Sequence, residues 1–252
     1  ATVTVDSVSV DESAGTATFT ATLDAAVDDT FTVDYAAADG TAVAGSDYTA
    51  ASGTLTFVGA ASETQTFTVP ILDDTVVEDA ETYTVSLSNV QAGGRSVSTG
   101  ADGTGTITDA DSTTITITGP ATLSEGNTGT YTVSLSNPIA IDGSSGDLTL
   151  EILASDGTAI VDVDTNNSAG LSGNTPHTIT ISEGNDSYTF TMTAIVDTDL
   201  ESDESYTVTI QNADTDDAID ALVAIDGAGQ TVTTTIPNAD TVGVSISGPA
   251  TV

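Results

Sequence analysis

Near the start of the chain, residues 16–23 read Thr16-Ala-Thr-Phe-Thr-Ala-Thr-Leu23, with Thr at every other position. The intervening residues are apolar, and this alternation predicts a β-strand with one buried face. The turn-forming pair Ala14-Gly15 precedes the stretch and Asp24 follows it. The same pattern predicts further strands over 30–37, 53–58, 64–71, 81–89 and 103–108, and then over 129–136, 148–154, 177–181, 187–196, 204–212 and 230–236. Short strands at this spacing are typical of β-sandwiches.

An internal repeat divides the chain into units. The segment Thr113-Thr-Ile-Thr-Ile-Thr-Gly-Pro-Ala-Thr-Leu123 reappears as Val242-Gly-Val-Ser-Ile-Ser-Gly-Pro-Ala-Thr-Val252, and residues 2–10 occupy the matching place in the first unit. We therefore expect an all-β chain of tandem immunoglobulin-like antiparallel sandwiches, over residues 1–111 and 112–240. The second unit diverges and carries an insertion at 156–173, whose composition predicts an exposed loop.

Residues 241–252 have the sequence of a first strand without the rest of its sandwich. We interpret them as the start of a third repeat, or as a strand donated to an identical subunit. The expected partners are thus neighbouring repeats of the same chain or identical subunits.

The composition is dominated by acid, since Asp and Glu number 38 against a single basic residue, Arg95, for a net charge of −37. This excludes nucleic-acid binding, which needs Lys and Arg to neutralise phosphates, and disfavours anionic membrane surfaces. No apolar run is long enough to insert into a membrane. Aromatic residues make up only 4% of the chain, so we expect a core of Val, Ile, Leu and Ala. Cysteine is absent, which leaves bound metal as the obvious staple of the fold.

The acidic residues gather at five places in each unit, all predicted to be loops. In the first unit these are Asp11-Glu12, Asp47, Asp73-Asp74, Glu78-Asp79-Ala80-Glu81 and Asp109-Ala110-Asp111. In the second unit they are Glu125, Asp162 or Asp164, Asp197-Thr198-Asp199, Glu201-Ser202-Asp203-Glu204 and Asp240. Carboxylates gathered at one end of a sandwich repel one another, by nearly ~1 kcal/mol per pair at about 5 Å even in water. A cation would relieve this repulsion, and Ca²⁺, which takes six to eight oxygen ligands in irregular geometry, fits best.

Three segments of the first unit together resemble the Calx-β family. They read Tyr35-Ala-Ala-Ala-Asp-Gly-Thr-Ala-Val-Ala-Gly-Ser-Asp-Tyr48, Gly53-Thr-Leu-Thr-Phe57 and Val69-Pro-Ile-Leu-Asp-Asp-Thr-Val-Val-Glu-Asp-Ala-Glu-Thr-Tyr-Thr-Val-Ser-Leu-Ser-Asn89. That family includes regulatory Ca²⁺ sensors of sodium–calcium exchangers and long arrays in bacterial surface proteins. In the second unit Ala154–Ala159 and Ile195–Glu204 also match, but the Gly-Ser-Asp-Tyr element is replaced by Val161-Asp-Val-Asp164 and the insertion.

The resemblance implies a seven-stranded sandwich with Ca²⁺ bound at one end. It implies these ligands in the first unit: Glu12, Asp47, Asp73, Asp74, Glu78, Asp109 and Asp111. Glu81 is implied either as a ligand or as a cap of the next strand. The candidates in the second unit are Glu125, Asp164, Asp197, Asp199, Glu201 and Asp240. Thr75 and Ala110 interrupt runs of acids that the family's sensor domains carry, so fewer or weaker ions are expected.

These features predict a Ca²⁺-binding structural segment of an extracellular adhesin stalk or surface filament of bacterial type, in which Ca²⁺ rigidifies the domains and their joints. Two alternatives remain open: a module that recognises a carbohydrate or partner through the insertion, and a pair of Ca²⁺ sensor domains. An enzyme is not expected, because the only histidine, His177, has no visible nucleophile or acid beside it.

Overall fold

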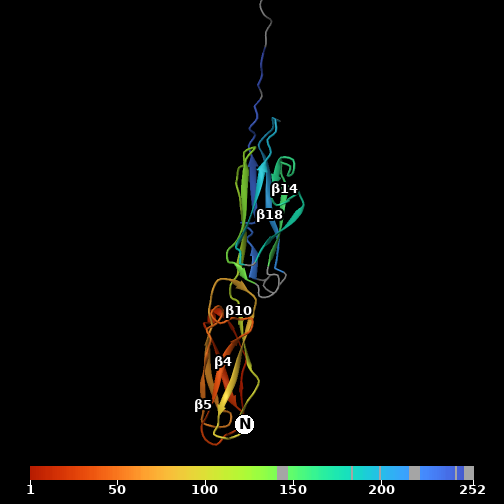
Figure 1. Cartoon of the computed structure of the whole chain (residues 1–252). Coiled ribbons are helices and arrows are strands. Elements are labelled where there is room, and N and C mark those ends of the chain that lie inside the picture. Colours follow the sequence, from red (N-terminus) through yellow and green to blue (C-terminus); the bar gives the residue numbers. More distant parts are fainter. Residues whose placement is uncertain (141–146, 183, 199, 216–221, 242, 247–252) are drawn as a thin grey trace, which may run out of the picture. The chain divides into compact units, whose positions relative to one another are not determined.

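The computed structural model describes every residue except 141–146, 183, 199, 216–221, 242 and 247–252. Its contacts divide the chain into two compact units, Ala1–Asp111 and Ser112–Val252. Figure 1 shows that each unit consists of strands running along its length, with β4 and β5 side by side in the first and β14 and β18 in the second.

In the first unit, two sheets lie in the orders β6-β3-β1-β9 and β2-β10-β8-β4-β5. Most neighbours are antiparallel, whereas β1 pairs with β9 and β2 with β10 in parallel. The strands are β1 (Thr2–Val5), β2 (Val8–Asp11), β3 (Thr16–Leu23), β4 (Phe31–Asp39), β5 (Ser52–Phe57), β6 (Thr64–Pro70), β7 (Val77–Glu78), β8 (Glu81–Gln91), β9 (Ser98–Thr99) and β10 (Gly103–Thr108). One 3-10 turn, η1 (Glu12–Ala14), separates β2 from β3.

In the second unit, the sheets lie in the orders β15-β17-β12-β11-β19 and β16-β14-β18-β20. Here β11 and β19 form the parallel pair. The strands are β11 (Thr113–Thr118), β12 (Thr128–Leu135), β13 (Ile139–Ala140), β14 (Leu148–Asp156), β15 (Thr165–Asn167), β16 (Pro176–Ile181), β17 (Ser187–Ala194), β18 (Glu204–Asp214), β19 (Val223–Ile225) and β20 (Thr231–Ile236). Each unit is thus a β-sandwich, as the alternation predicted.

Each strand predicted from alternation is present, with ends within two residues of the prediction, and β3 spans residues 16–23 as expected. The first strand differs, because residues 2–10 do not form one strand. They form β1 in one sheet and β2 in the other, and the chain crosses between the sheets at Asp6-Ser7. This crossing creates the parallel pairing of β2 with β10, which matters for the site.

The insertion at 156–173 is largely exposed, as its composition predicted, but it is not a loop throughout. It contains β15, which pairs antiparallel with β17 at the edge of a sheet. Ala159, Val161, Thr165 and Leu171 are all buried. The small polar residues of the insertion are mostly exposed, whereas the apolar residues between them anchor the segment to the sandwich.

The cores depend on aromatic residues more than their scarcity predicted. Tyr48, Tyr83, Phe19, Phe31 and Phe57 are among the largest fully buried side chains of the first unit. Tyr48 stacks on Tyr83 with ring centroids 4.6 Å apart, and Phe31 stacks on Phe57 at 5.2 Å. The expected core of Val, Ile, Leu and Ala was thus incomplete, because tyrosines such as Tyr48, Tyr83 and Tyr206 are also fully buried.

Within the described residues, no helix is long and apolar enough to cross a membrane. Of the segment 241–252, residues 242 and 247–252 lie outside the described part of the chain, and residues 243–246 have no regular secondary structure. Val244 and Ile246 in this segment are exposed.

Candidate metal centre

The first carboxylate of the site, Glu12, is placed by the turn between β2 and β3. Asp11 caps η1 through its side chain, which accepts a hydrogen bond from the Ser13 amide at 3.0 Å. Gly15 ends the turn with a φ of 68°, a left-handed conformation that glycine adopts without strain. Glu12 is only 5% exposed although its side chain is ionisable.

Parallel pairing of β2 with β10 brings Glu12 beside the last residues of the first unit, 109–111. In the β2–β10 ladder Asp11 lies opposite Thr108, so the residue after each strand meets its counterpart. Glu12 accepts a hydrogen bond from the Ala110 amide at 3.3 Å, and the Asp109 side chain accepts one from the Asp111 amide at 2.5 Å. The crossing of the first strand between sheets thus positions a buried carboxylate against the acidic stretch 109–111.

Two groups of three carboxylates result. Oxygens of Glu12, Asp73 and Asp111 lie within 4.8 Å of one another, and so do oxygens of Asp47, Glu78 and Glu81. We call these the Glu12 group and the Glu81 group. Asp109 links the two groups, because its side chain accepts hydrogen bonds from the Asp111 amide of the Glu12 group at 2.5 Å and from the Glu78 amide of the Glu81 group at 2.7 Å. A hollow is lined by members of both groups together with Asp74, Asp79 and Asp109.

The turn that carries Asp47 is fixed by its own hydrogen bonds. The Asp47 side chain accepts the Val43 amide at 2.6 Å, and its carbonyl accepts the Leu72 amide at 3.0 Å. The Asp39 side chain, at the end of β4, accepts the Ala44 amide at 2.9 Å and the Tyr48 hydroxyl at 2.6 Å. The Asp47 carboxylate is therefore held in place by a turn that is itself anchored to the core through Tyr48.

The electrostatics of the hollow are unfavourable for bare carboxylates. The pKa of Glu12 is raised to about 8, mainly by burial and also by the Asp109 and Asp111 carboxyls, against the opposing Ala110 hydrogen bond. The pKa of Glu78 is raised to about 7, mainly by burial and then by the charges of Asp74, Asp47 and Asp109. The pKa of Asp111 is raised by burial and then by Asp109, Asp73 and Asp74. Such groups demand either protons or a cation.

The same turn exists in the second unit. The Asp164 side chain accepts the Ile160 amide at 2.5 Å, as Asp47 accepts Val43, and the Asp156 side chain accepts the Val161 amide at 2.9 Å, as Asp39 accepts Ala44. Asp164 therefore takes the place of Asp47. Asp162, the other candidate at this position, instead accepts the Ser172 hydroxyl at 2.9 Å and the Gly173 amide at 3.1 Å within the insertion.

Glu204 is the centre of the second unit's cluster. Its pKa is raised mainly by burial and, to a smaller extent, by the charges of Asp164, Glu201, Asp197 and Glu125. Glu204 and Glu81 are equivalent, because each begins its strand and pairs with an Ile, Ile236 and Ile107 respectively. Glu204 was not among the candidates and Glu81 was left undecided. The repeated spacing of Glu78 to Glu81 and of Glu201 to Glu204 was the sequence signal that could have identified both.

The remaining candidates fall into place as follows. Asp74 lines the hollow without belonging to either group, and its side chain accepts the Val76 amide at 2.7 Å. Asp240 repeats Asp111, because its amide donates to the Asn238 side chain at 2.6 Å, and the Ala239 amide lies 3.5 Å from the Glu125 carboxylate. Asp199 lies outside the described residues. Among the described residues, groups of three carboxylates within 4.8 Å occur in the first unit alone.

The donor set tests the expected metal. All members of both groups are carboxylates, the chain has no cysteine, and its one histidine, His177, lies in β16 of the second unit. Zinc sites draw on sulfur and imidazole, whereas Ca²⁺ takes carboxylate oxygens in flexible geometry. The residues present therefore fit Ca²⁺, and they would hold it through the Glu12 and Glu81 groups.

The chain matches one family model and several solved structures. The family model of the Calx-beta domain matches residues 1–120 and again 109–238. Among solved structures, the apo-form Calx CBD1 domain is 26% identical over 43% of this chain and 98% of its own, with a TM-score of 0.39. The CBD12 of CALX1.2 is 17% identical over 94% of this chain and 100% of its own, with a TM-score of 0.42. The calcium binding domain CBD12 of CALX1.1 is 17% identical over 92% and 98%, also with a TM-score of 0.42. No curated protein matches significantly.

Proposed function

The chain belongs to the Calx-beta family, as two consecutive domains, and from this we propose that it is a Ca²⁺-binding structural segment of an extracellular stalk or surface filament. The ions would be held at the acidic end of each sandwich. A relative of similar architecture is described as a calcium binding domain, which supports the choice of ion.

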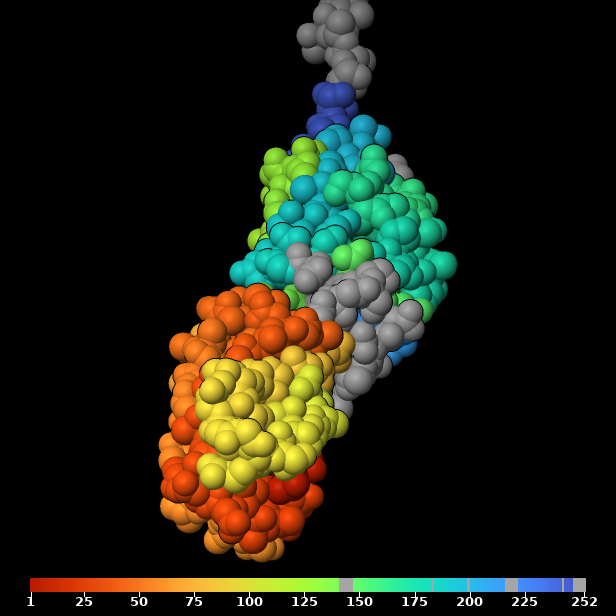
Figure 2. Space-filling model, turned by 60° about the horizontal axis from the view of Figure 1, so that its bottom comes forward, coloured from red at the N-terminus to blue at the C-terminus, as the bar shows by residue number. Residues whose placement is uncertain are grey.

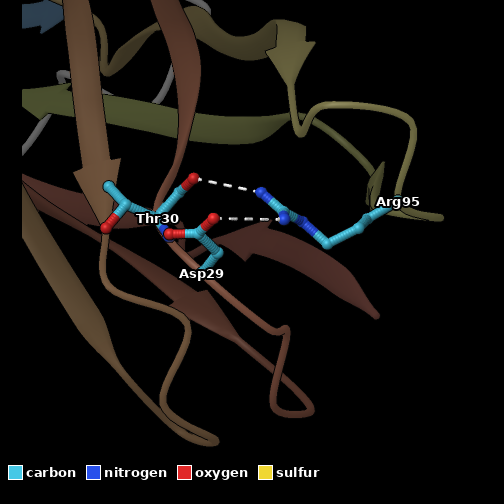
Figure 3. Close-up of polar contacts among 3 residues, drawn as sticks. All are labelled: Asp29, Thr30 and Arg95. Carbon is cyan, nitrogen blue, oxygen red and sulfur yellow. Dashed lines mark hydrogen bonds and ion pairs between the residues drawn. The ribbon is translucent and has the colours of Figure 1, made fainter.

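The observation that carries the proposal is the convergence of six carboxylates from separate loops into the Glu12 and Glu81 groups. No basic side chain compensates them. Arg95, the only Lys or Arg, reaches Asp29 at 3.6 Å and donates to the Thr30 carbonyl at 3.3 Å (Figure 3). Its loop, residues 92–97, is drawn yellow on the surface in Figure 2.

The register shows that Arg95 is at the opposite end of its sheet from the site. Residues at the start of β4 pair with the end of β8, near Arg95, whereas Asp39 at the end of β4 pairs with Tyr83, two residues from Glu81. A cation from solution is thus the available counter-charge. Three carboxylates within 4.8 Å in a partly desolvated hollow repel by more than the ~1 kcal/mol per pair expected in water.

A structural role follows from the position of the site in the chain. Asp111, a member of the Glu12 group, is the last residue of the first unit, and β11 starts two residues later. A Ca²⁺ ion held by Asp111 would restrain the residues that lead into the second unit. A stalk of tandem domains needs such a restraint to limit bending at the connection. Without cysteine, such a stalk has metal as its available cross-link.

The alternative of ligand recognition through the insertion has less support. Polar side chains of the insertion form hydrogen bonds within it. The Asn167 side chain donates to the Leu171 carbonyl and accepts from the Leu171 amide, both at 2.8 Å, and the Ser172 hydroxyl donates to Asp162. Their hydrogen-bonding capacity is used to hold the insertion in its own conformation. This favours a structural role for the insertion over a recognition loop.

The experiment is calorimetric titration of the whole chain with CaCl₂ after treatment with EDTA, paired with thermal unfolding in EDTA and in millimolar Ca²⁺. Ca²⁺ binding to the folded chain should raise the melting temperature, since it adds RT ln(1 + [L]/Kd) to the free energy of unfolding. Asp73→Asn should lower the binding heat. The matched control is Asp102→Asn, an exposed acid at the other end of β10, which should change nothing. Equal melting temperatures in EDTA and Ca²⁺ would refute Ca²⁺ binding.

Small-angle scattering of the same samples tests the mechanical part of the proposal. If Ca²⁺ restrains the connection between the units, the distribution of interatomic distances should narrow when Ca²⁺ is added. Identical distributions in Ca²⁺ and EDTA would limit the ions to a role inside each unit.

A further inference from the structure

Register allows the two units to be compared residue by residue. In the first unit Thr16 pairs with Pro70, and in the second the equivalent Thr128 pairs with Thr193. Counting forward along both chains places Leu72 opposite Ile195 and Asp73 opposite Val196. The backbone confirms this match, because the Leu72 amide donates to the Asp47 carbonyl at 3.0 Å, and the Ile195 amide to the Asp164 carbonyl at 2.8 Å.

The Glu12 group therefore has an incomplete counterpart. Glu125 stands for Glu12 and Asp240 for Asp111, as the hydrogen bonds from Ala239 and to Asn238 show. The third carboxylate, Asp73, is replaced by Val196. In addition, Asn238 replaces the charged Asp109.

The valine fills the neighbourhood of Glu125 with methyl groups. A side-chain carbon added to Gly126 would lie 2.9 Å from Cγ2 of Val196, so Val196 packs directly against the residue next to Glu125. Val196 is nevertheless 66% exposed. An exposed valine where the first unit has a carboxylate offers no oxygen to a cation.

The Glu81 group, in contrast, keeps all three of its carboxylates in the second unit, although their oxygens do not all come within 4.8 Å of one another there. Asp164 corresponds to Asp47, Glu201 to Glu78 and Glu204 to Glu81, and the charges of Asp164 and Glu201 act on Glu204. Asp197 corresponds to Asp74, which lines the hollow of the first unit. One half of the acidic site has thus been kept in the second unit and the other half altered.

We propose that the first unit has two Ca²⁺ positions and the second unit one, because Val196 and Asn238 remove the position that Glu12, Asp73 and Asp111 form in the first. This inference rests on the proposed function. It makes the units unequal: the first unit would take up more Ca²⁺ and be stiffened by it more strongly, while the second keeps one ion at its Asp164 turn.

The experiment compares Ca²⁺ stoichiometry in the whole chain and three variants by calorimetric titration. Asp73→Val should lose about one equivalent of bound Ca²⁺, and the reciprocal Val196→Asp combined with Asn238→Asp should gain about one. Val58→Asp is the control for adding an acid, since Val58 is 67% exposed, as Val196 is, and lies in a turn beside Glu63 far from the site. It should leave the stoichiometry unchanged.

A second readout separates binding from folding. In EDTA, Asp73→Val should raise the melting temperature by relieving repulsion, and the double variant should lower it; with Ca²⁺ both differences should reverse. An unchanged stoichiometry in both variants, with Ca²⁺ still binding to the wild-type chain, would overturn this inference and leave the proposed function standing. Absence of Ca²⁺ binding to every form, wild type included, would refute the proposed function itself.

Discussion

In the absence of divalent cations, raising the pH should destabilise the first unit. Glu12 has its pKa raised from 4.5 to about 8 and Glu78 from 4.5 to about 7, in both cases mainly by burial. A raised carboxyl pKa means that the folded state binds the proton more tightly than the unfolded state. The resulting stability is fully present below pH 4.5 and is lost as the pH rises towards 7 for Glu78 and towards 8 for Glu12.

The magnitude follows from the shifts. Each unit of pKa difference corresponds to about 1.4 kcal/mol, so the full shift of Glu12 sets an upper limit of about 5 kcal/mol. The hollow is open to solvent on one side, and screening by water reduces this energy. We therefore expect the free energy of unfolding to fall by about 2 kcal/mol from Glu12 and Glu78 together. For a domain of this size that lowers the melting temperature by roughly 10 °C.

The assay is differential scanning calorimetry in EDTA between about pH 6 and pH 9, above the range in which ordinary carboxyls titrate. The same series in millimolar Ca²⁺ should not show the fall, because the ion favours the ionised form and binds more tightly as protons leave. The Glu12→Gln variant has no carboxyl to ionise at this position, so its melting temperature in EDTA should fall less with pH, and the contribution of Glu78 should remain. A melting temperature in EDTA that is constant or rises over this range would refute the reasoning about Glu12 and Glu78.

Three further predictions concern single residues. Tyr131→Phe should destabilise the second unit by about 1–3 kcal/mol in urea unfolding, because the Tyr131 hydroxyl bonds the buried Tyr206 and Thr234 hydroxyls. Phe19→Tyr should cost nothing or stabilise the first unit, because Phe19 lies edge-on to Tyr83, whose buried hydroxyl has no partner among the described residues. Asp164→Asn should weaken Ca²⁺ binding at least several-fold in calorimetry, whereas Asp162→Asn, which keeps the acceptor for Ser172, should leave it unchanged. Arg95→Gln should change the free energy of unfolding by less than about 1 kcal/mol, because its ion pair with Asp29 is exposed and long, at 3.6 Å.

Most of the fold could be predicted because alternation is a local property. Strands such as β3 and β10 contain their own evidence, a buried face at every second residue. The division of the first strand was missed, although the sequence contains its signature: apolar residues fall at odd positions, Val3 and Val5, and then at even positions, Val8 and Val10. A change of phase moves the buried face to the other side, which is what a strand that passes from one sheet to the other requires.

The site was harder to predict from the sequence, because its geometry depends on pairing between segments that are distant along the chain. The acidic loops were visible, but the burial of Glu12 depends on the parallel ladder between β2 and β10, which joins residues nearly a hundred positions apart. Which carboxylates share a group likewise depends on register. Glu81 and Glu204 were undervalued because they start strands, and a strand residue seems unlike a loop ligand until the first position of the strand is seen to face the hollow.

The second unit's departure from the motif has a physical explanation in the insertion. In the first unit the Tyr48 hydroxyl donates to Asp39 at 2.6 Å and so braces the turn that carries Asp47. In the second unit Thr165 stands in the place of Tyr48, and its buried hydroxyl has no partner among the described residues. The brace is supplied instead by Asn174, just after the insertion, whose side chain donates to Asp156 at 2.6 Å. The inserted residues therefore do what one tyrosine does in the first unit: they return the chain to Asp156 and keep the Asp164 turn in the same conformation, which explains why a motif that looks broken in sequence retains its carboxylate in space.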